Sequence, residues 1–468
     1  MFNIIVQFYF QLVRGNNIEP KLLEILDQMK YQENLYFFEF SLLYRLLGHT
    51  RDIFLGKGEC DLSYIQLFCW WRYYPTLAYN AFDTFVFSFD QKPYGSWKDA
   101  RNMCQYIYKR TDNQNHPFID FICKRLIYQI NVDLWNINQT KISLAAKWAP
   151  RERKKHKWLF YKMSRMMYGD SKRSFMLFRK TISFLNRRLG TVEIKMSQKR
   201  LTDIDMRHVG AKAILKYNHF FSKNNFSLEK TKIKKCEISQ FVKMALFSKN
   251  NNNINILWEK FKPDVKFSNI IPILDISSFS FENESLFNMI GLGIYFSEKS
   301  TAPFNNRLLL CGGNIKWVIF SKNMTFVDKV NYLYKLISPA EPNICNALLL
   351  LEKSFQKIQL EQVDKIKILI LSCNFIYRNV DLYKCIESIF EKVPRFFFVN
   401  LGEGTKCLDI LHNNYTLLSG SNINNFNFLK KGGPLSKKYK PSYSFFQKNI
   451  MHERYALLNR YLLNFQTI

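Results

Sequence analysis

The 468-residue sequence lacks any hydrophobic run that approaches the roughly 18 residues of a membrane-spanning helix. Its first thirteen residues are mostly apolar, but no basic segment precedes them and no small-residue cleavage site follows them. We therefore expect this segment to be a helix or strand of the fold and not a signal peptide. These absences predict a protein without a membrane partner.

Arrangements typical of zinc binding and catalysis are also missing. The ten cysteines include no Cys-x-x-Cys pair and no histidine at zinc-ligand spacing, and scattered single cysteines are typical of an intracellular protein, cytoplasmic or nuclear. None of the seven histidines lies in a Ser- or Cys-nucleophile motif. The Gly-rich turns at Gly56-Lys-Gly58 and Gly402-Glu-Gly404 lack phosphate-loop and dinucleotide spacing. We expect no enzymatic activity and no cofactor.

Acidic residues are scarce, with 38 Asp and Glu against 68 Lys and Arg and a formal net charge of +30. The abundance of Phe, Ile, Lys, Asn and Tyr fits an A+T-rich genome, which raises the lysine content without any functional cause. Such a bias would spread the charge evenly, yet residues 141–243 hold 27 Lys and Arg against 7 Asp and Glu, a net +20. This concentration predicts a polyanionic partner, with nucleic acid favoured over an anionic membrane.

Residues 1–250 are predicted to form an all-α half, because apolar residues recur at helical spacing from about residue 18 onward. Helices are expected near 20–29, 35–47, 61–73, 76–88, 97–107, 117–131, 157–168, 173–189 and 204–221. Many short helices with brief connections predict a stacked, HEAT-like repeat array, although the sequence has no clean repeat period.

The pattern changes near residue 250, where the Asn-rich run after Lys249 predicts a linker over residues 251–265. Strands are expected at 270–275, 316–320, 366–371, 395–399 and 415–418, with helices near 285–299, 326–338, 343–358 and 380–391. This alternation predicts a doubly wound α/β domain over residues 266–425, with its site at the strand ends around Asp275, Ser372 and Asn400. Residues 426–468 are expected to form a basic extension with a final helix near 450–464.

Two parts of the basic region are candidate nucleic-acid contacts. In the helix predicted over 173–189, an apolar stripe lies opposite Arg173, Lys180 and Arg187. Upstream, a loop interrupted by Pro150 carries a dense cluster between two tryptophans. Its candidate residues are Lys147, Trp148, Arg151, Arg153, Lys154, Lys155 and Lys157. Cations in a loop reach phosphates, and a tryptophan stacks on an unpaired base. The alternative is an ordinary solvated helix face with Trp148 and Trp158 as core anchors.

Another charge-dense loop, containing Arg51, Asp52, Lys57, Glu59 and Asp61, has two interpretations. It is either a functional site or an ion-paired and capped junction between two helices. We favour the junction.

Several stretches, in this order and spacing, resemble a domain-of-unknown-function family found in plants, bacteria and large DNA viruses. They are Arg51–Asp61, Tyr94–Asp99, Leu144–Glu152, Phe184–Ile204, Pro272–Ser277 and Leu292–Ser300. That family is related to the TROVE module joined to a von Willebrand factor A domain, the combination found in Ro-type RNA-binding proteins. The resemblance spans roughly residues 35–420. It implies a helical-repeat half that binds RNA, an A-type sheet domain and no established enzymatic activity.

The metal site of the A domain is altered in this sequence. The family pattern supplies Asp-x-Ser-x-Ser, a later Thr and a further Asp, all oxygen ligands suited to Mg²⁺. Asp275 and Ser277 match the first two ligands, but Phe279 and Cys373 occupy two others, and no hydroxyl is evident near Pro342-Asn343. The resemblance thus implies a degenerate site in which we expect no tightly held Mg²⁺. The alternative is rescue by nearby oxygen ligands, namely Ser278, Ser280, Glu282 or Asn374.

Two functional hypotheses follow from the sequence. The first is a non-enzymatic nucleic-acid-binding protein, with RNA or another single strand as its partner and the A domain as a scaffold. The second is a protein-interaction subunit of a larger, viral transcription or ribonucleoprotein complex, in which the A domain docks a protein partner. The basic stretch Lys430–Lys440 fits a nuclear address, a phosphate clamp or a linker equally well.

Overall fold

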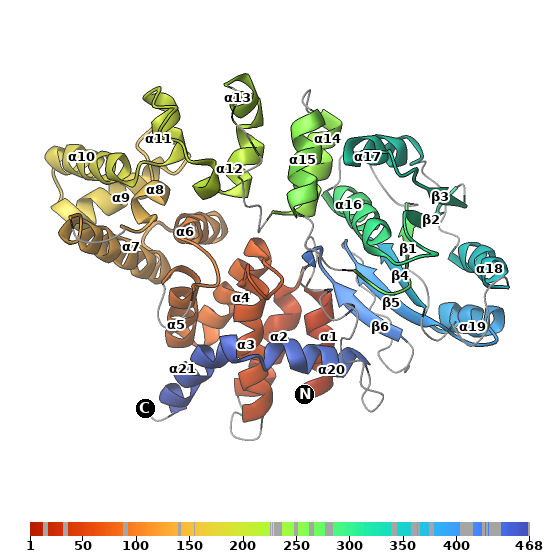
Figure 1. Ribbon diagram of the computed structural model, residues 1–468. Coiled ribbons are helices and arrows are strands. Elements are labelled where there is room, and N and C mark those ends of the chain that lie inside the picture. The colour runs from red at the N-terminus through yellow and green to blue at the C-terminus, as the bar shows by residue number, and fades with distance from the viewer. Residues whose placement is uncertain are drawn as a thin grey trace. The chain divides into compact units, whose positions relative to one another are not determined.

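A computed structural model of the chain describes most of its residues (Figure 1). The described residues are 1–12, 17–30, 36–87, 92–138, 142–153, 155–224, 226, 228, 236–247, 251–261, 266–276, 284–313, 315–337, 344–356, 363, 366–373, 379–402, 415–423, 426, 429 and 441–466. They divide into two compact units. The helical unit comprises Glu19–Asp205 and Ile450–Ile468, and the α/β unit comprises Met1–Ile18 and Met206–Asn449.

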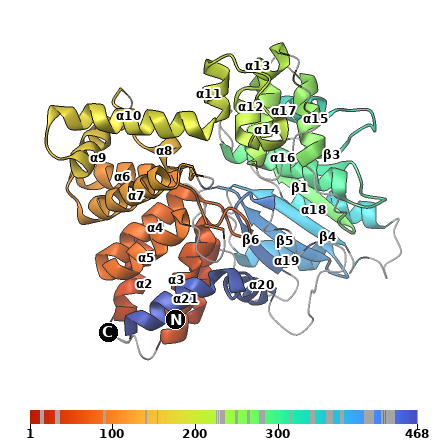
Figure 2. The same cartoon turned by 60° about the vertical axis from the view of Figure 1, so that its left-hand side comes forward.

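Short helices that pack on their sequence neighbours make up the helical unit (Figure 2). They are α2 (Glu19–Lys30), α3 (Phe37–Arg51), α4 (Cys60–Tyr73), α5 (Pro75–Val86), α6 (Lys98–Thr111), α7 (Pro117–Trp135), α8 (Ala145–Trp148), α9 (Lys157–Tyr168), α10 (Lys172–Leu189), α11 (Val192–Ser197), the 3₁₀ turn η4 (Glu453–Tyr455) and α21 (Ala456–Gln466). Local signals set their ends: Pro117 opens α7, and the His116 ring nitrogen accepts a hydrogen bond from the Phe118 N–H. The helices expected between residues 20 and 189 are confirmed.

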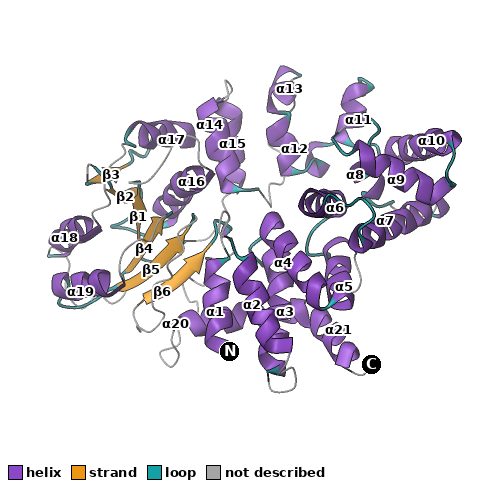
Figure 3. Ribbon diagram, turned by 180° about the vertical axis from the view of Figure 1, so that it is seen from behind, coloured by secondary structure: helices purple, strands orange, loops and turns teal. Residues whose placement is uncertain are grey.

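A six-stranded mixed sheet organises the α/β unit (Figure 3). Its strands are β1 (Ile270–Asp275), β2 (Arg307–Cys311), β3 (Lys316–Ile319), β4 (Lys367–Ser372), β5 (Arg395–Asn400) and β6 (Tyr415–Ser419). The order is β3-β2-β1-β4-β5-β6, and every neighbouring pair is parallel except β2 with β3. The described part of β1 is buried along its whole length, because helices cover a parallel sheet on its faces.

The α/β unit also contains helices, which come before, between and after the strands in the sequence. They are α1 (Phe2–Gln11), the 3₁₀ turn η1 (Met206–His208), α12 (Ala211–Lys216), α13 (Asn218–Lys223), α14 (Ile238–Phe247), α15 (Asn251–Phe261), α16 (Glu284–Lys299), α17 (Phe326–Lys335), α18 (Ile344–Phe355), α19 (Asn379–Ile389) and α20 (Pro441–Ile450). Helix α16 packs on β1, and α18 and α19 lie together on the other side of the sheet (Figures 1 and 3). Helix α1 contacts β6, so the apolar first segment is part of the fold as expected.

Several sequence-based boundaries differ from the structure. Asn251–Phe261 forms helix α15 with Trp258 fully buried, so the expected linker over 251–265 is wrong for these residues. The expected helix over 204–221 is broken into η1, α12 and α13, and these belong to the α/β unit, as does α14. Strand β2 was not anticipated. The expected division at residue 250 follows the change in sequence pattern, whereas the compact units divide at Asp205.

Cys345 of α18 and Cys385 of α19 form a disulfide. This pair departs from the expectation of scattered single cysteines. Among the described helices, none combines the length and apolar character that crossing a membrane requires.

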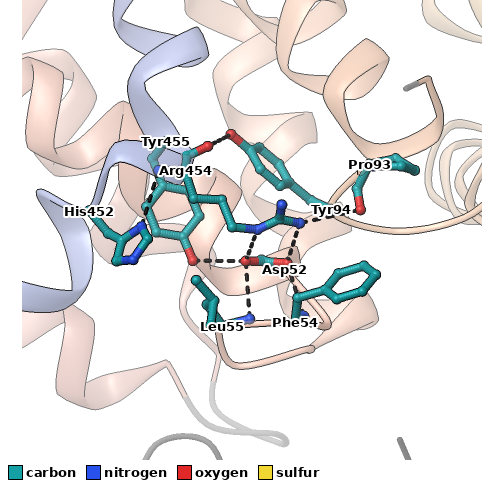
Figure 4. Close-up of polar contacts among 8 residues, drawn as sticks. All are labelled: Asp52, Phe54, Leu55, Pro93, Tyr94, His452, Arg454 and Tyr455. Atoms are coloured by element: carbon teal, nitrogen blue, oxygen red, sulfur yellow. Dashed lines mark hydrogen bonds and ion pairs between the residues drawn. The ribbon is translucent and has the colours of Figure 1, made fainter. Parts of the chain in front are cut away.

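The end of the chain returns to the helical unit through a buried ion pair (Figure 4). Arg454 donates from Nε and Nη2 to the two carboxylate oxygens of Asp52, at 2.6 and 2.8 Å. The same carboxylate accepts from the Tyr455 hydroxyl at 3.0 Å and from the backbone N–H groups of Phe54 and Leu55. Asp52 is fully buried and the Arg454 side chain is 10% exposed, so this is a bidentate pair shielded from water.

A second buried pair begins at the preceding residue. Arg51 donates from Nε and Nη2 to the carboxylate of Asp99, at 3.0 and 2.7 Å, and the Tyr64 hydroxyl donates to the same group. Gly95 lies against this pair, since a Cβ there would be 2.4 Å from the Asp99 carboxylate. The charge-dense loop is therefore an ion-paired helix junction, as favoured from the sequence. We call the two pairs together the double clasp.

Replacing Arg454 by Met is expected to destabilise the helical unit by about 3–5 kcal/mol, because it leaves the Asp52 carboxylate buried without its counter-charge. Urea unfolding followed by hydrogen exchange in α3 and α21 measures the loss. The exposed Arg460→Met variant is the matched control from the same terminal segment and should change the stability little. Equal effects of the two variants would contradict a stabilising role for the clasp.

Acid should weaken the same region through His49, which is fully buried beside Tyr455. Burial, reinforced by the charges of Lys57 and His452, lowers the pKa of His49 from 6.5 to about 3. Between these two pKa values, His49 is protonated in the unfolded chain and neutral in the folded chain. The contribution of His49 to the free energy of unfolding is complete above pH 6.5 and is lost as the pH falls toward 3. By pH 5 the loss is about 2 kcal/mol. Urea unfolding at pH 7 and 5 tests this, and a His49→Phe variant with the same pH dependence as wild type would contradict it.

Candidate nucleic-acid interface

One face of helix α9 alternates cations with large apolar side chains. Lys157, Tyr161 and Arg165 are four residues apart, and so are Trp158, Lys162 and Met166. Because residues four apart lie above one another on a helix, the two rows form one continuous strip along α9. The buried face of α9, with Leu159, Phe160 and Met163, packs into the helical unit instead.

This strip borders a cleft of about 870 Å³ within the helical unit, which we call the α9 cleft. It is lined by Gln114, Asn115, Lys155, Lys157, Trp158, Tyr161, Lys162, Arg165, Met166 and Phe175. The first two come from the turn between α6 and α7, and Phe175 comes from α10, which packs on α9 (Figures 1 and 2). Four cationic side chains and three aromatic rings therefore line the same cleft.

Ring contacts hold the aromatic side chains of the α9 cleft in place. The Tyr161 and Phe175 rings meet edge to face with centroids 4.8 Å apart, and the Trp158 ring lies 4.7 Å from that of Tyr108 on α6. The Lys157 ammonium lies 5.6 Å from the Tyr161 centroid and the Arg165 guanidinium 5.8 Å from that of Phe175. Such cation–π contacts keep both charges at the cleft.

Acidic side chains engage two of the four cations. Lys162 forms a 2.6 Å ion pair with Asp120 and also donates to the side-chain oxygen of Asn115 at 3.0 Å. Arg165 pairs with Asp170, whose side chain is 83% exposed. Within the described residues, no acidic side chain forms an ion pair with Lys155 or Lys157. The α9 cleft is therefore an electropositive site.

The two tryptophans that flank the predicted loop cluster have different surroundings. The Trp148 ring is covered by cations, with Arg101 at 5.3 Å, Lys98 at 5.7 Å and Lys147 at 5.9 Å from its centroid. Lys147 also pairs with Glu193 at 3.2 Å. The half-buried Trp148 ring thus lies beside cations of the helical unit itself. Trp158, in contrast, lines the α9 cleft.

The other candidate cations differ in exposure. Arg153, Lys155 and Lys157 are exposed, Arg151 is half-buried and its pKa is lowered by burial, and Lys154 lies outside the described residues. On α10, Arg173, Lys180 and Arg187 are exposed, while Phe178, Ile182 and Leu185 are buried as the apolar stripe predicted. Among the predicted contacts that the structure describes, Lys155 and Lys157 line the α9 cleft.

Sequence reasoning missed most of the residues around the α9 cleft. Tyr161, Lys162 and Arg165 are not among the predicted contacts, although the four-residue steps 157–161–165 and 158–162 are a usable signal. Phe175 was assigned to the apolar stripe of α10, and it is half-buried because it faces Tyr161. Nothing in the sequence pattern singled out the turn with Gln114 and Asn115.

At the carboxyl ends of the strands, where a site is expected, the described side chains contact one another. Asp275 at the end of β1 is buried and accepts a 2.7 Å hydrogen bond from the Ser372 hydroxyl at the end of β4. Asn400 lies opposite Ser372 in the register and accepts from the Gly402 N–H. Burial raises the pKa of the Cys373 thiol, which favours its protonated form. Ser277, the second expected metal ligand, lies outside the described residues.

Over the ranges that the structure describes, no group of three or more His, Cys, Asp and Glu side chains is arranged to hold a metal ion.

Comparisons with known proteins give distant similarities. No family model matches the chain. It is 24% identical over 324 residues to the uncharacterised protein L728 of Acanthamoeba polyphaga mimivirus, an alignment that covers 59% of this chain and 54% of the relative. The chain thus spans about half the length of this curated relative. Among solved structures it is similar to the RO (RSR) protein of Deinococcus radiodurans, with a TM-score of 0.37 and 10% identity over 89% of this chain and 93% of that chain.

A titration of His156 tests the electrostatics beside the α9 cleft. Burial, Arg101 and Lys155 lower the pKa of His156 from 6.5 to about 4, and its Nδ1 lies 3.0 Å from the side-chain oxygen of Gln105. An NMR titration should place its pKa near 4. Lys155→Gln should raise that pKa by removing a nearby positive charge, whereas Lys180→Gln on α10 should leave it unchanged. A wild-type value near 6.5 would contradict this description of the site.

Proposed function

We propose that the protein is a non-enzymatic nucleic-acid-binding protein that acts without a cofactor. In this proposal the helical unit contacts the phosphates of RNA, and the α/β unit serves as a scaffold or docking module. The observation that carries the proposal is the α9 cleft, where exposed cations border half-buried aromatic rings. Cations with interleaved aromatic side chains are the combination that binds single-stranded nucleic acid.

The distribution of charge around the cleft supports a polyanionic partner. Arg153 precedes the cleft, and Arg173, Lys180 and Arg187 continue the exposed positive charge along α10. In the described part of the chain, no acidic side chain forms an ion pair with these four residues. Cations held close together repel one another, and a polyanion removes that repulsion while releasing its own counterions.

The resemblance of the sequence motifs supports the same proposal. It implies a TROVE-like helical region that binds RNA and an A-type domain whose metal ligands are altered at Phe279 and Cys373. Two of those motifs, Arg51–Asp61 and Tyr94–Asp99, contain Arg51, Asp52 and Asp99, three of the four charged residues of the double clasp. We accordingly include a relation to that family, and an intracellular location in the cytoplasm or nucleus, in the proposal.

A protein-docking role for the α/β unit is the second candidate. Strand β3 forms one edge of the sheet, and Ile319 at its end is 63% exposed. An edge strand presents backbone groups that can pair with an added strand. A stoichiometric protein partner that survives nuclease treatment and high salt would favour this role over RNA binding.

Salt titrations of single-stranded RNA binding test the first candidate. If about six phosphates are neutralised, log K should fall with log salt with a slope of roughly −4. Replacing Arg153, Lys155 and Lys157 together by Gln should weaken binding and reduce the slope to roughly −2.

The control replaces three exposed lysines of the α/β unit, Lys322, Lys335 and Lys353, by Gln and changes the net charge by the same amount. It should retain the wild-type slope. The proposal fails if wild type does not bind at about 50 mM salt, where such contacts are strong, or if both triple variants lose the same affinity.

A further inference from the structure

We propose that the α9 cleft accepts an unpaired nucleobase of a single-stranded nucleic acid, while the cations at its rim hold the neighbouring phosphates. This inference rests on the proposed function and specifies the ligand of that same site. It predicts discrimination between paired and unpaired strands, which phosphate contacts alone do not provide.

The size and lining of the cleft fit a base. Its volume of about 870 Å³ lies within the range of roughly 300–1,000 Å³ that is typical of pockets for small organic ligands. Bases within a duplex are stacked and paired, so only the phosphates of a duplex would contact the protein, at the rim of the cleft. A base that is free of its partner strand can enter and reach the rings.

The aromatic side chains are held ready for stacking. Trp158 and Tyr161 lie on one side of α9 and are both half-buried, so each ring has part of its surface at the cleft. Tyr108 and Phe175 support them from α6 and α10. Rings fixed in this way lose little conformational entropy when a ligand binds. Because every base has a π face, the contact tolerates any sequence.

The polar groups at the cleft divide into two sets. Gln114 and Asn115 present side-chain amides, which can donate to and accept from the edge of a base. Asn115 is oriented by Lys162, which is itself held by Asp120. Lys155, Lys157 and Arg165 remain for phosphates. The ion pair between Arg165 and the exposed Asp170 is weakly stabilising, so a phosphate can replace that carboxylate.

An acidic peptide would use the same cations, but its carboxylates make no use of three aromatic rings in the cleft. The interleaving of rings and cations on α9 therefore favours a nucleic acid over an acidic protein segment. The rings distinguish neither ribose from deoxyribose nor one base from another. Both RNA and DNA strands consequently belong in the test.

The experiment compares two single-stranded oligonucleotides of equal length and charge, one with all its bases and one with abasic positions. Affinities are measured for the full-length protein with RNA and with DNA versions. Wild type should bind the base-containing strand roughly 5- to 100-fold more tightly, the range expected for one stacked base. Trp158→Leu and Tyr161→Leu should each reduce this preference while keeping the affinity for the abasic strand, which also reports that the variant is folded. Tyr128→Leu, an exposed tyrosine on α7, is the matched control.

Each contrary result has a distinct meaning. Equal wild-type affinity for the two strands would overturn base insertion and leave phosphate binding intact. Failure to bind either strand would overturn the proposed function as well. Competition by a poly-glutamate peptide as strong as that by the base-containing strand would overturn the nucleic-acid assignment of the α9 cleft. A loss of preference in Tyr128→Leu equal to that in Tyr161→Leu would remove the assignment of the rings.

Discussion

Two adjacent residues of opposite charge, Arg51 and Asp52, hold the helical unit together. They stand at the end of α3, and each is buried against a partner distant in sequence: Asp99 at the start of α6 for Arg51, and Arg454 near the chain end for Asp52. Burying four charges is costly unless each is paired and hydrogen-bonded. The bidentate geometry and the added Tyr64, Tyr455 and backbone donors meet that requirement. The two pairs therefore join the end of α3 to the start of α6 and to the segment before α21.

Helix α6 links the double clasp to the α9 cleft. Asp99 fixes the first turn of α6, and α6 carries Tyr108, which supports Trp158, before it ends at the turn with Gln114 and Asn115. A shift of α6 would therefore move a supporting ring and two lining amides together. Charged side chains thus occur in two arrangements in the helical unit. At the double clasp they are buried and paired with the opposite charge, whereas on α9 and α10 they are exposed and largely positive.

Sequence periodicity predicted the longer helices of the helical unit and five of the six strands, because amphipathic spacing and buried apolar runs are local signals. It failed where the deciding partner is remote. The Asn-rich start of α15 reads as a linker, yet Trp258 packs face to face with Phe326 of α17 and makes the segment part of a core. Likewise, β2 is a short run beginning with an exposed Arg307, and its identity depends on pairing with β1 and β3. The basic loop was located correctly, but periodicity could not show that Trp148 is covered by cations and Trp158 is at a cleft.

Neighbouring groups decide which candidate site can take a ligand. At the carboxyl end of the sheet, Ser372 donates to the Asp275 carboxylate inside the protein, so a ligand would have to compete with a satisfied, buried contact. At the α9 cleft, Lys155, Lys157 and Arg165 are exposed, and Arg165 pairs with Asp170, whose side chain is 83% exposed. Replacing water and a weak surface ion pair costs less than breaking a buried hydrogen bond. The excess positive charge of residues 141–243 thus includes cations that a polyanion can reach without breaking a buried hydrogen bond of this kind.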